Sequence, residues 1–496
     1  MSNGFVKITP FNGFDSTNPD NAKQNNYAWA MEEMGDYIYV GTGRNIVFSV
    51  IKAGTFPGLQ VPKEFVPQNV DMNAEIWRYK KDGSEGWQRV YKAPPQLGII
   101  GFRFMIRYTT PRGETALYAV GYTIQPKIVI LKSLDGVQWT PLVTDIPGTS
   151  TRAMIEHNGK LYMGVLGDPV AGDTLLYVSE DPEKNGWTLV STQGDPDRNP
   201  RGGIVTMVSF NGHIYVGTAP VGGFEVWRTE GLEPQKDGWK LVVDKGAGDG
   251  LNEVPLSMGV FKDHIYVGTA IAFAISSVDP SRKIVPPKPF DLIRINRHDE
   301  WKVIVGGEPV LPTNPVTGKR NKGKYVSGFG DISNGYCWQL IQFGNRFYLG
   351  TWDWSVLLPP FISSLATINK GVLPSVLPSF LNPANIINLV REYNLKPLLK
   401  LLKGSKRDFY ENLGFDMYVS ENGENWKAVT LDGLGNPYNY GLRNLLPSED
   451  GKLYLGTANP FQGCEVWVKG TKHAEDDMES EIELDVEEDD DKEKDD

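Results

Sequence analysis

Residues 211–218 read NGHIYVGT, and this phrase decides the fold because close copies of it recur along the chain. Each copy joins a tight turn, often Asn-Gly, to a strand-forming run. The other copies are GDYIYVGT 35–42, a degenerate ETALYAVG 114–121, NGKLYMGV 158–165, KDHIYVGT 262–269, GNRFYLGT 344–351 and DGKLYLGT 450–457. Asn-Gly between apolar runs favours a β-hairpin, because the primed turn needs positive φ at both central residues. The repeat therefore predicts seven hairpins.

A third and a fourth strand are predicted after the hairpins. Third strands read AEIWRY from Ala74, FEVWRT from Phe224 and CEVWVK from Cys464. Fourth strands begin at Trp87, Trp139, Trp187, Trp239, Trp301 and Trp426. The last repeat lacks a fourth strand, and the N-terminal segment GFVKITPF at 4–11 can supply it. Closing a ring in this way removes free sheet edges. We therefore predict an all-β, seven-bladed β-propeller whose N-terminal strand closes the last blade.

The composition agrees with this fold and limits the class of partner. The 496 residues include 54 Gly and 34 Pro, which favours turn-rich β structure. The formal net charge is -11, but residues 475–496 hold fifteen Asp and Glu against two Lys, a local charge of -13. The remaining body carries about +2, which disfavours nucleic-acid binding. We expect one propeller domain over 1–474 and a disordered acidic tail over 475–496.

Targeting signals and reactive side chains are sparse. The N-terminus has no signal-peptide pattern, and no run of about 18 apolar residues is present. Two cysteines, Cys337 and Cys464, give no disulfide framework, so we expect a cytoplasmic monomer. His157, His213 and His264 fall in hairpin turns, and no nucleotide-binding fingerprint is present. We therefore expect no metal and no cofactor.

The links between third and fourth strands carry a further motif. SLDGVQW from Ser133 and SENGENW from Ser420 are its clearest forms, with looser copies from Ser179 and Lys80. These links resemble the Asp-box, or BNR, repeats of sialidase-like propellers, in which Ser, Asp and Gly shape the turn before a packed Trp. In Ser133–Gly136 the usual residue between Asp and Gly is missing. The resemblance implies the fold, and its functions range from sialidases to lectins.

Three long insertions, at 43–72, 270–289 and 352–414, are predicted to leave the same face of the propeller. They are apolar, which is typical of functional loops rather than solvated ones. Within the third, residues 382–407 have helical spacing and a cluster of Lys and Arg. This partly helical insertion suits a lid or a helix on an anionic membrane surface, which makes peripheral membrane attachment an alternative to a free cytoplasmic protein. It also suits a cap packed on the blades.

Aligning the first strands by their turns places one residue per blade near the channel mouth. These residues are Trp29, Arg103, Arg152, Val205, Leu256, Trp338 and Arg443. Arginine holds carboxylates and phosphates bidentately, so three converging arginines indicate an anion site. The resemblance to sialidases implies the same device, since an arginine triad binds the substrate carboxylate there. The alternative is that the arginines pair with carboxylates between blades. Trp352 and Trp354 are expected beside Trp29 and Trp338 at this mouth.

Candidate catalytic groups near the mouth are Asp353, Asp168, Tyr336 and Tyr440. Asp353 lies between two tryptophans, and an apolar setting raises a carboxyl pKa toward the range that acid–base catalysis needs. The tyrosines are possible proton donors or, by the sialidase resemblance, a nucleophile. Each of these groups also fits a role as a turn cap.

Two functions follow as hypotheses. The first is a propeller that binds an anionic amphiphile or glycan beneath an apolar lid, with hydrolysis or isomerisation of that ligand as an open question. If the protein is an enzyme, a glycosidase- or esterase-like hydrolase fits better than an oxidoreductase. The alternative is a noncatalytic lectin or protein-interaction scaffold, attached to a membrane surface through the insertions.

Overall fold

A computed structural model describes residues 4–46, 48, 66–142, 144–166, 172–190, 194–271, 288–357, 413–470 and 482–483. Antiparallel strands dominate these residues, and the α-helix α1 (Pro19–Gln24) precedes the first long strand. Asn18 caps α1 by accepting a hydrogen bond from the Asn21 backbone, and Pro19 occupies its first turn. The prediction of an all-β chain is confirmed.

The strands pair, mostly in chain order, into antiparallel groups of four, which we call sheets; single residue pairs join five of these groups into one 21-stranded sheet. Sheet 1 contains β2 (Asn25–Met34), β3 (Tyr37–Arg44), β4 (Glu75–Lys80) and β5 (Gln88–Lys92). Sheet 2 contains β6 (Ile99–Thr109), β7 (Thr115–Thr123), β8 (Ile130–Ser133) and β9 (Thr140–Leu142). Sheet 3 contains β10 (Ser150–His157), β11 (Lys160–Leu166), β12 (Leu175–Ser179) and β13 (Thr188–Val190). Sheet 4 contains β14 (Ile204–Phe210), β15 (His213–Thr218), β16 (Glu225–Thr229) and β17 (Trp239–Val243).

The remaining sheets follow the same order. Sheet 5 contains β18 (Val254–Phe261), β19 (His264–Ala270), β20 (Leu292–Asn296) and β21 (Trp301–Val305). Sheet 6 contains β22 (Asn334–Phe343), β23 (Arg346–Asp353), β24 (Met417–Ser420) and β25 (Lys427–Thr430). Sheet 7 contains β26 (Gly441–Pro447), β27 (Lys452–Ala458) and β28 (Val466–Gly470), and its outer strand is β1 (Val6–Lys7).

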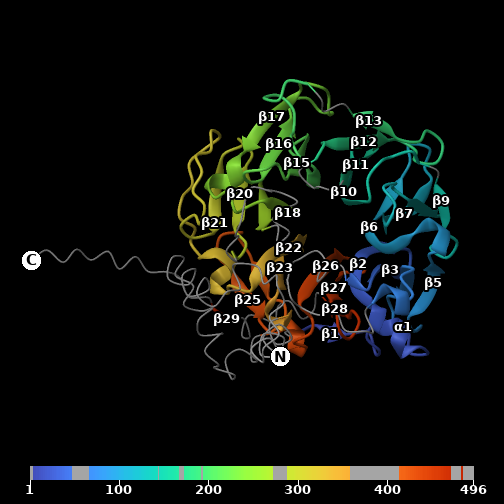
Figure 1. Cartoon of the computed structure of the whole chain (residues 1–496). Helices are drawn as coiled ribbons and strands as arrows, with labels where there is room; N and C mark the ends of the chain where they lie inside the picture. The colour runs from blue at the N-terminus through green and yellow to red at the C-terminus, as the bar shows by residue number, and fades with distance from the viewer. Residues whose placement is uncertain are drawn as a thin grey trace, which may run out of the picture.

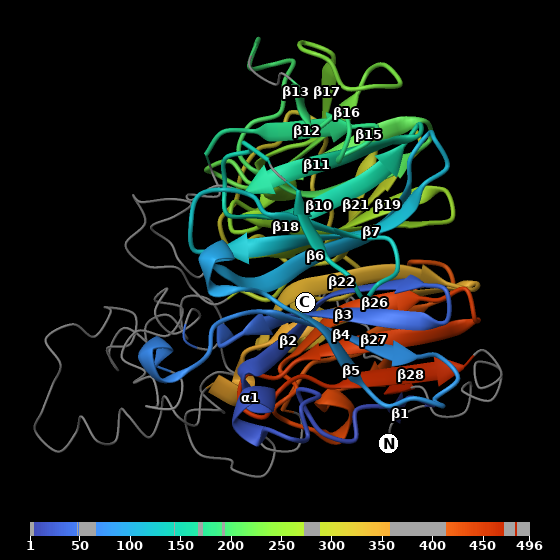
Figure 2. The same ribbon diagram turned by 90° about the vertical axis from the view of Figure 1, so that its right-hand side faces the viewer.

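The sheets surround a central axis, which makes the protein a β-propeller. Figure 1 shows them as a ring, with the first strand of each sheet on the inside. Single residue pairs join several neighbouring sheets, for example Gly43 with Gly101 and Trp352 with Gly441. Figure 2 shows α1 at the face where the innermost strands begin, and the first-to-second hairpin turns lie at the opposite face.

The hydrophobic core lies between neighbouring sheets. One cluster joins Tyr39 and Ile76 of sheet 1 to Phe102 and Leu117 of sheet 2, and all four side chains are buried. Comparable clusters lie between other neighbours. Because a strand alternates its side chains between two faces, each sheet buries both faces against its neighbours.

The links before the fourth strands form side-chain-stabilised turns. Ser133 Oγ accepts from the Gly136 backbone at 2.8 Å, and Asp135 Oδ1 accepts from Val137 and Gln138. Ser420 and Asn422 make the matching contacts in sheet 6. Gly136 and Gly423 both have positive φ, at 71° and 76°, which glycine adopts without strain. The kinship with Asp-box proteins stays a prediction.

Several predicted features lie outside the described residues. These are residues 382–407, Asp168 and most of the three insertions. Within the acidic tail the structure describes β29 (Ile482–Glu483), which pairs with β25 at Ala428 and Lys427. The rest of the tail lies outside the described residues, so the disorder expected there stays a prediction. No helix among the described residues is long and apolar enough to cross a membrane.

Candidate functional site

Each innermost strand has an irregularity at the position that the sequence analysis placed near the channel. The pairing register of β2 with β3 shifts between Ala28 and Ala30, which leaves Trp29 as the extra residue. The same shift spans the equivalent residues of the other sheets: Arg103, Arg152, Val205, Leu256, Trp338 and Arg443. A β-bulge re-aims the side chain of its extra residue. We call these seven residues the bulge ring.

The bulge ring borders a cavity of about 280 Å³ on the central axis. Among its residues, Arg103, Arg152, Leu256, Trp338 and Arg443 line this cavity. The aromatic and cationic members come from consecutive sheets, in the order Trp338, Arg443, Trp29, Arg103 and Arg152, when sheets 6, 7, 1, 2 and 3 are followed around the ring. Val205 and Leu256 complete the ring in sheets 4 and 5. One arc of the ring is therefore cationic and aromatic, and the other is apolar.

Two arginines lie over tryptophan rings of the preceding sheet. The Arg103 guanidinium is 5.2 Å from the Trp29 ring centroid, and the Arg443 guanidinium is 5.3 Å from that of Trp338. Glycines allow this packing: a Cβ on Gly101 would lie 2.3 Å from Trp29, and one on Gly441 would lie 2.3 Å from Trp338. A cation over an aromatic face gains about 0.5–2 kcal/mol, so the aromatic rings stabilise and orient the guanidinium groups.

The three guanidinium groups have no carboxylate partner among the described residues, although the chain forms many other Arg and Lys ion pairs. Burial lowers the pKa of Arg152 well below its ordinary value, and the neighbouring charges of Arg103 and Arg443 lower it further. Burial and the charge of Arg103 lower the pKa of Arg443 to about 9. Burial also lowers the pKa of Arg103. Both causes disfavour the charged form, so an anion between these groups would relieve the electrostatic cost.

Buried hydrogen-bond donors without partners lie in the same arc. Trp29 Nε1, Trp338 Nε1, Arg103 Nε and Arg443 Nε are buried and make no hydrogen bond within the described part of the chain. Buried donors are normally paired, and leaving one unpaired costs about 1–3 kcal/mol. The arc therefore offers donors and positive charge, and a ligand rich in acceptor oxygens matches it.

An aromatic cluster lies beside the arc. The Tyr27 ring contacts both Trp29 and Trp338 edge-on, with centroid distances of 5.7 Å in each case. The Tyr27 and Tyr440 hydroxyls are hydrogen-bonded to each other. Tyr336 stacks on Trp352 at 4.4 Å, and burial raises the pKa of Tyr336 to about 12. Trp352 and Trp354, 3% and 5% exposed, are packed side chains, and neither lines the cavity.

Asp353 is fully buried and does not line the cavity. Its Oδ2 lies 2.6 Å from Ser333 Oγ, and the same hydroxyl lies 2.6 Å from Asp331 Oδ1. Burial raises the pKa of Asp353 well above its ordinary value, and the charges of Asp331 and Asp416 raise it further. One hydroxyl has a single proton to donate, so the three groups satisfy each other when one carboxyl is protonated. Asp353 does not line the cavity, so its predicted catalytic role stays a prediction.

A buried acidic residue lies at the start of several third strands and was not among the predicted site residues. Glu75 accepts hydrogen bonds from Asn25 Nδ2 at 3.0 Å and Trp77 Nε1 at 2.9 Å. Glu465 repeats this with Asn439 and Trp467, and Asp416 with Asn334 and Tyr418. Asp291 accepts from Asn252, and Glu225 from Trp227. The recurring Glu-x-Trp of the third strands was the available signal, and an Asn at or just before the start of the innermost strand completes it.

Sheet 6 differs from the others at this position. Glu75 pairs with Arg89 at 2.9 Å, Glu465 with Lys7 at 2.8 Å, and Asp291 with both Lys288 and Arg320. Glu225 pairs with Arg201. Asp416 has no ion-pair partner in the described ranges, and burial, with the charge of Asp331 second, raises its pKa to about 8. A proton takes the place of the cation in this sheet.

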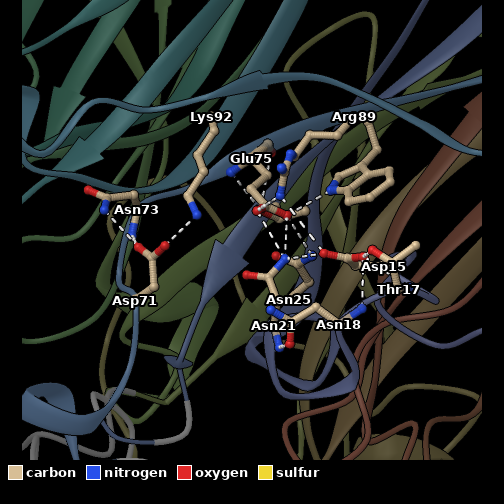
Figure 3. A network of polar contacts seen from close by, with 12 residues as sticks. Asp15, Thr17, Asn18, Asn21, Asn25, Asp71, Asn73, Glu75, Arg89 and Lys92 are labelled. Atoms are coloured by element: carbon tan, nitrogen blue, oxygen red, sulfur yellow. Dashed lines mark hydrogen bonds and ion pairs between the residues drawn. The ribbon is translucent and has the colours of Figure 1, made fainter.

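A second cavity, of about 570 Å³, lies beside α1 in sheet 1. Figure 3 shows that the charged groups around it point toward one another. Arg89 pairs with Glu75, Lys92 pairs with Asp71, and Asp15 accepts from Asn21 at 2.9 Å. These charges are balanced within the protein, so this network holds α1 against the start of β2 and offers little surplus charge to a ligand. No group of three or more His, Cys, Asp or Glu within the described residues is arranged to hold a metal ion.

Comparisons with known proteins find only distant structural similarities. No protein-family model matches the chain, and no curated protein matches it. Similar solved structures include a lectin from Burkholderia pseudomallei (10% identity, 90% of this chain, 97% of that chain, TM-score 0.45). Others are the WD40 β-propeller domain of Doa1 (9%, 95%, 99%, 0.44) and an ancestral GH74 enzyme (10%, 81%, 0.43). This chain spans only 43% of the GH74 chain. All three likenesses are too distant to argue from, and the fold rests on the strand pairings.

Proposed function

We propose that the protein binds an anionic ligand in the central channel, at the arc formed by Arg103, Arg152 and Arg443. The observation that carries this proposal is the set of three converging guanidinium groups without a carboxylate partner in the described structure. The unpartnered Nε groups of Arg103 and Arg443 support it. A carboxylate, sulfate or phosphate supplies both the charge and the acceptor oxygens that these groups lack.

The proposal extends to the architecture around the site. The ring is a closed seven-bladed propeller of the sialidase-like, Asp-box kind, in which β1 provides the last strand. Support comes from the pairing of Val6 with Val468 and from the Ser133 and Ser420 turns. The ligand is an amphiphile or an anionic glycan, since the ring combines a cationic arc with the apolar Val205 and Leu256.

Binding without catalysis fits the geometry better than hydrolysis or isomerisation. The described residues that line the cavity include no Asp, Glu, His, Cys or Tyr. Its hydroxyl groups come from Thr206 and Ser257, and Ser257 Oγ donates to the Cys337 carbonyl. Cys337 is fully buried, and burial raises its thiol pKa to about 12, which suits a structural thiol. A receptor, lectin or scaffold role therefore takes precedence over an enzymatic one.

Calorimetric titration with sulfate and with inorganic phosphate tests the anion site. The Arg152→Gln variant should bind at least about tenfold more weakly than wild type, because a hydrogen bond to a charged group contributes about 1.5–3 kcal/mol. Arg198→Gln is the matched control, since Arg198 is half exposed and pairs with Glu230 at 3.0 Å. Equal affinity of Arg152→Gln and wild type would contradict the proposal.

A further inference from the structure

The channel below the bulge ring has an unusual wall. Each bulge-ring residue is followed two positions later by a large apolar side chain. In sheets 1 to 5 this residue is always methionine: Met31, Met105, Met154, Met207 and Met258. Sheets 6 and 7 have Leu340 and Leu445 there. We call the five methionines the methionine collar.

All five collar methionines line the same 280 Å³ cavity as the arginines. They are at most 9% exposed, and each belongs to a different cluster between neighbouring sheets. The chain has only 11 methionines, so five at equivalent positions around one axis is not a result of composition. Packing between blades explains an apolar residue here, but Leu340 shows that leucine also fits the position.

Methionine differs from leucine in adaptability. Its unbranched side chain has three rotatable bonds and a polarizable sulfur, so it fits irregular or changing shapes and is common at surfaces that bind varied apolar groups. A collar of methionines around a cavity therefore suits a wall that adjusts when an apolar group enters. The polar arc supplies convergent donors that orient a ligand, and the methionine collar supplies the apolar part of the same wall.

We propose that the ligand is an anionic amphiphile whose apolar body lies within the methionine collar while its acidic group is held by Arg103, Arg152 and Arg443. This inference rests on the anion site proposed above and chooses the amphiphile over the glycan. A sugar would bring many hydroxyl groups into the collar, where the side chains of Ser257, Gln339 and Asn444 already donate hydrogen bonds to backbone carbonyls. Burying unpaired hydroxyl groups is costly, whereas burying alkyl groups is favourable.

The test is a calorimetric series of straight-chain carboxylates from acetate to octanoate, with octan-1-ol, glucuronate and inorganic phosphate as further probes. Affinity should rise about fourfold with each added CH₂ until the cavity is filled, because burying one CH₂ contributes about 0.8 kcal/mol. Octan-1-ol should bind far more weakly than octanoate, because it lacks the charge.

The outcomes separate this inference from the anion site itself. If acetate, phosphate and octanoate bind with similar affinity, the anion site stands and the amphiphile inference is wrong. Glucuronate binding more tightly than hexanoate would also overturn it, in favour of a glycan. If none of the anions binds, the proposed function fails with it.

Paired methionine variants locate the apolar body. Met207→Ala should weaken octanoate binding at least about fourfold, because the alkyl chain loses a wall of the cavity. Met163→Ala is the control: Met163 is fully buried, but it does not line the cavity. Both variants lose a buried methionine, so a general loss of stability would affect them alike. Equal octanoate affinity in the two variants would show that the alkyl chain of octanoate does not lie in the methionine collar.

Discussion

At the scale of single residues, the buried acids of the third strands show how this fold handles charge. Glu75, Asp291 and Glu465 occupy equivalent buried positions, and each has an Arg or Lys partner within 3.0 Å. Asp416 occupies the same position without such a partner in the described residues, and lies near Asp331 and Asp353. A buried carboxylate needs a cation, hydrogen bonds or a proton. In sheet 6 the carboxyl of Asp416 is therefore protonated, whereas the equivalent acids of sheets 1, 5 and 7 form ion pairs.

This difference predicts a pH dependence of stability. The pKa of Asp416 is raised to about 8 in the folded protein, above the ordinary value of 3.8. The folded state then holds a proton that the unfolded state has lost, so stability falls as pH rises from about 4 to about 8. Asp416→Asn should reduce this slope and raise the melting temperature at pH 8.5.

Asp291→Asn provides the opposite control. Lys288 and Arg320 lower the pKa of Asp291 to about 2 even though burial opposes this shift. Removing that carboxylate leaves Lys288 and Arg320 without their ion-pair partner, which should lower the free energy of unfolding by about 3–5 kcal/mol. Thermal denaturation of both variants across pH 5–9 checks the pair. A melting temperature for Asp416→Asn below that of wild type at pH 8.5 would contradict the inference that Asp416 is protonated in the folded protein.

Equivalent residues could be identified from the sequence where a repeat fixed the alignment. The hairpin turns placed Trp29, Arg152 and Trp338 at equivalent positions, and the structure gives each a bulge. The acid network was not predictable in the same way, because Asn25 and Glu75 are 50 residues apart. Their contact depends on how the strands and the loops before them are placed in space. The pattern of apolar residues does not predict which polar side chains then meet.

At the scale of elements, β1 connects the two ends of the chain. Val6 pairs with Val468 and Lys7 with Trp467, and Lys7 Nζ lies 2.8 Å from Glu465. The Ile8 backbone donates to the Val466 carbonyl at 2.9 Å. The spare N-terminal strand was predictable because the last repeat lacks a fourth strand. The short strand β29 on β25 was not, because charge dominates the tail composition.

Removal of residues 1–8 should therefore lower the melting temperature and expose β28. The deletion leaves β28 as a free edge, which also promotes association through that edge. Hydrogen exchange should become faster in Val466–Gly470, while β16 and β17 of sheet 4 remain protected and serve as the internal control. Unchanged exchange in β28 would show that β1 contributes little to closing the ring.

At the scale of the whole molecule, the channel is asymmetric although its sheets are repeats. Sheets 6, 7, 1, 2 and 3 supply a continuous cationic and aromatic arc, and sheets 4 and 5 supply Val205 and Leu256. A repeat fold needs no such asymmetry for packing, because one residue type would serve in every sheet. We therefore expect the proposed ligand at the cationic and aromatic side of the channel, and the binding of an anion there is the central proposal.

Crystals soaked in sodium selenate test that claim most directly, because selenate is an oxyanion whose selenium gives an anomalous signal. We expect an anomalous peak within hydrogen-bond distance of at least two of Arg103, Arg152 and Arg443, and the loss of this peak in Arg152→Gln crystals. A channel without a peak, in crystals whose surface cations hold selenate, would contradict the account.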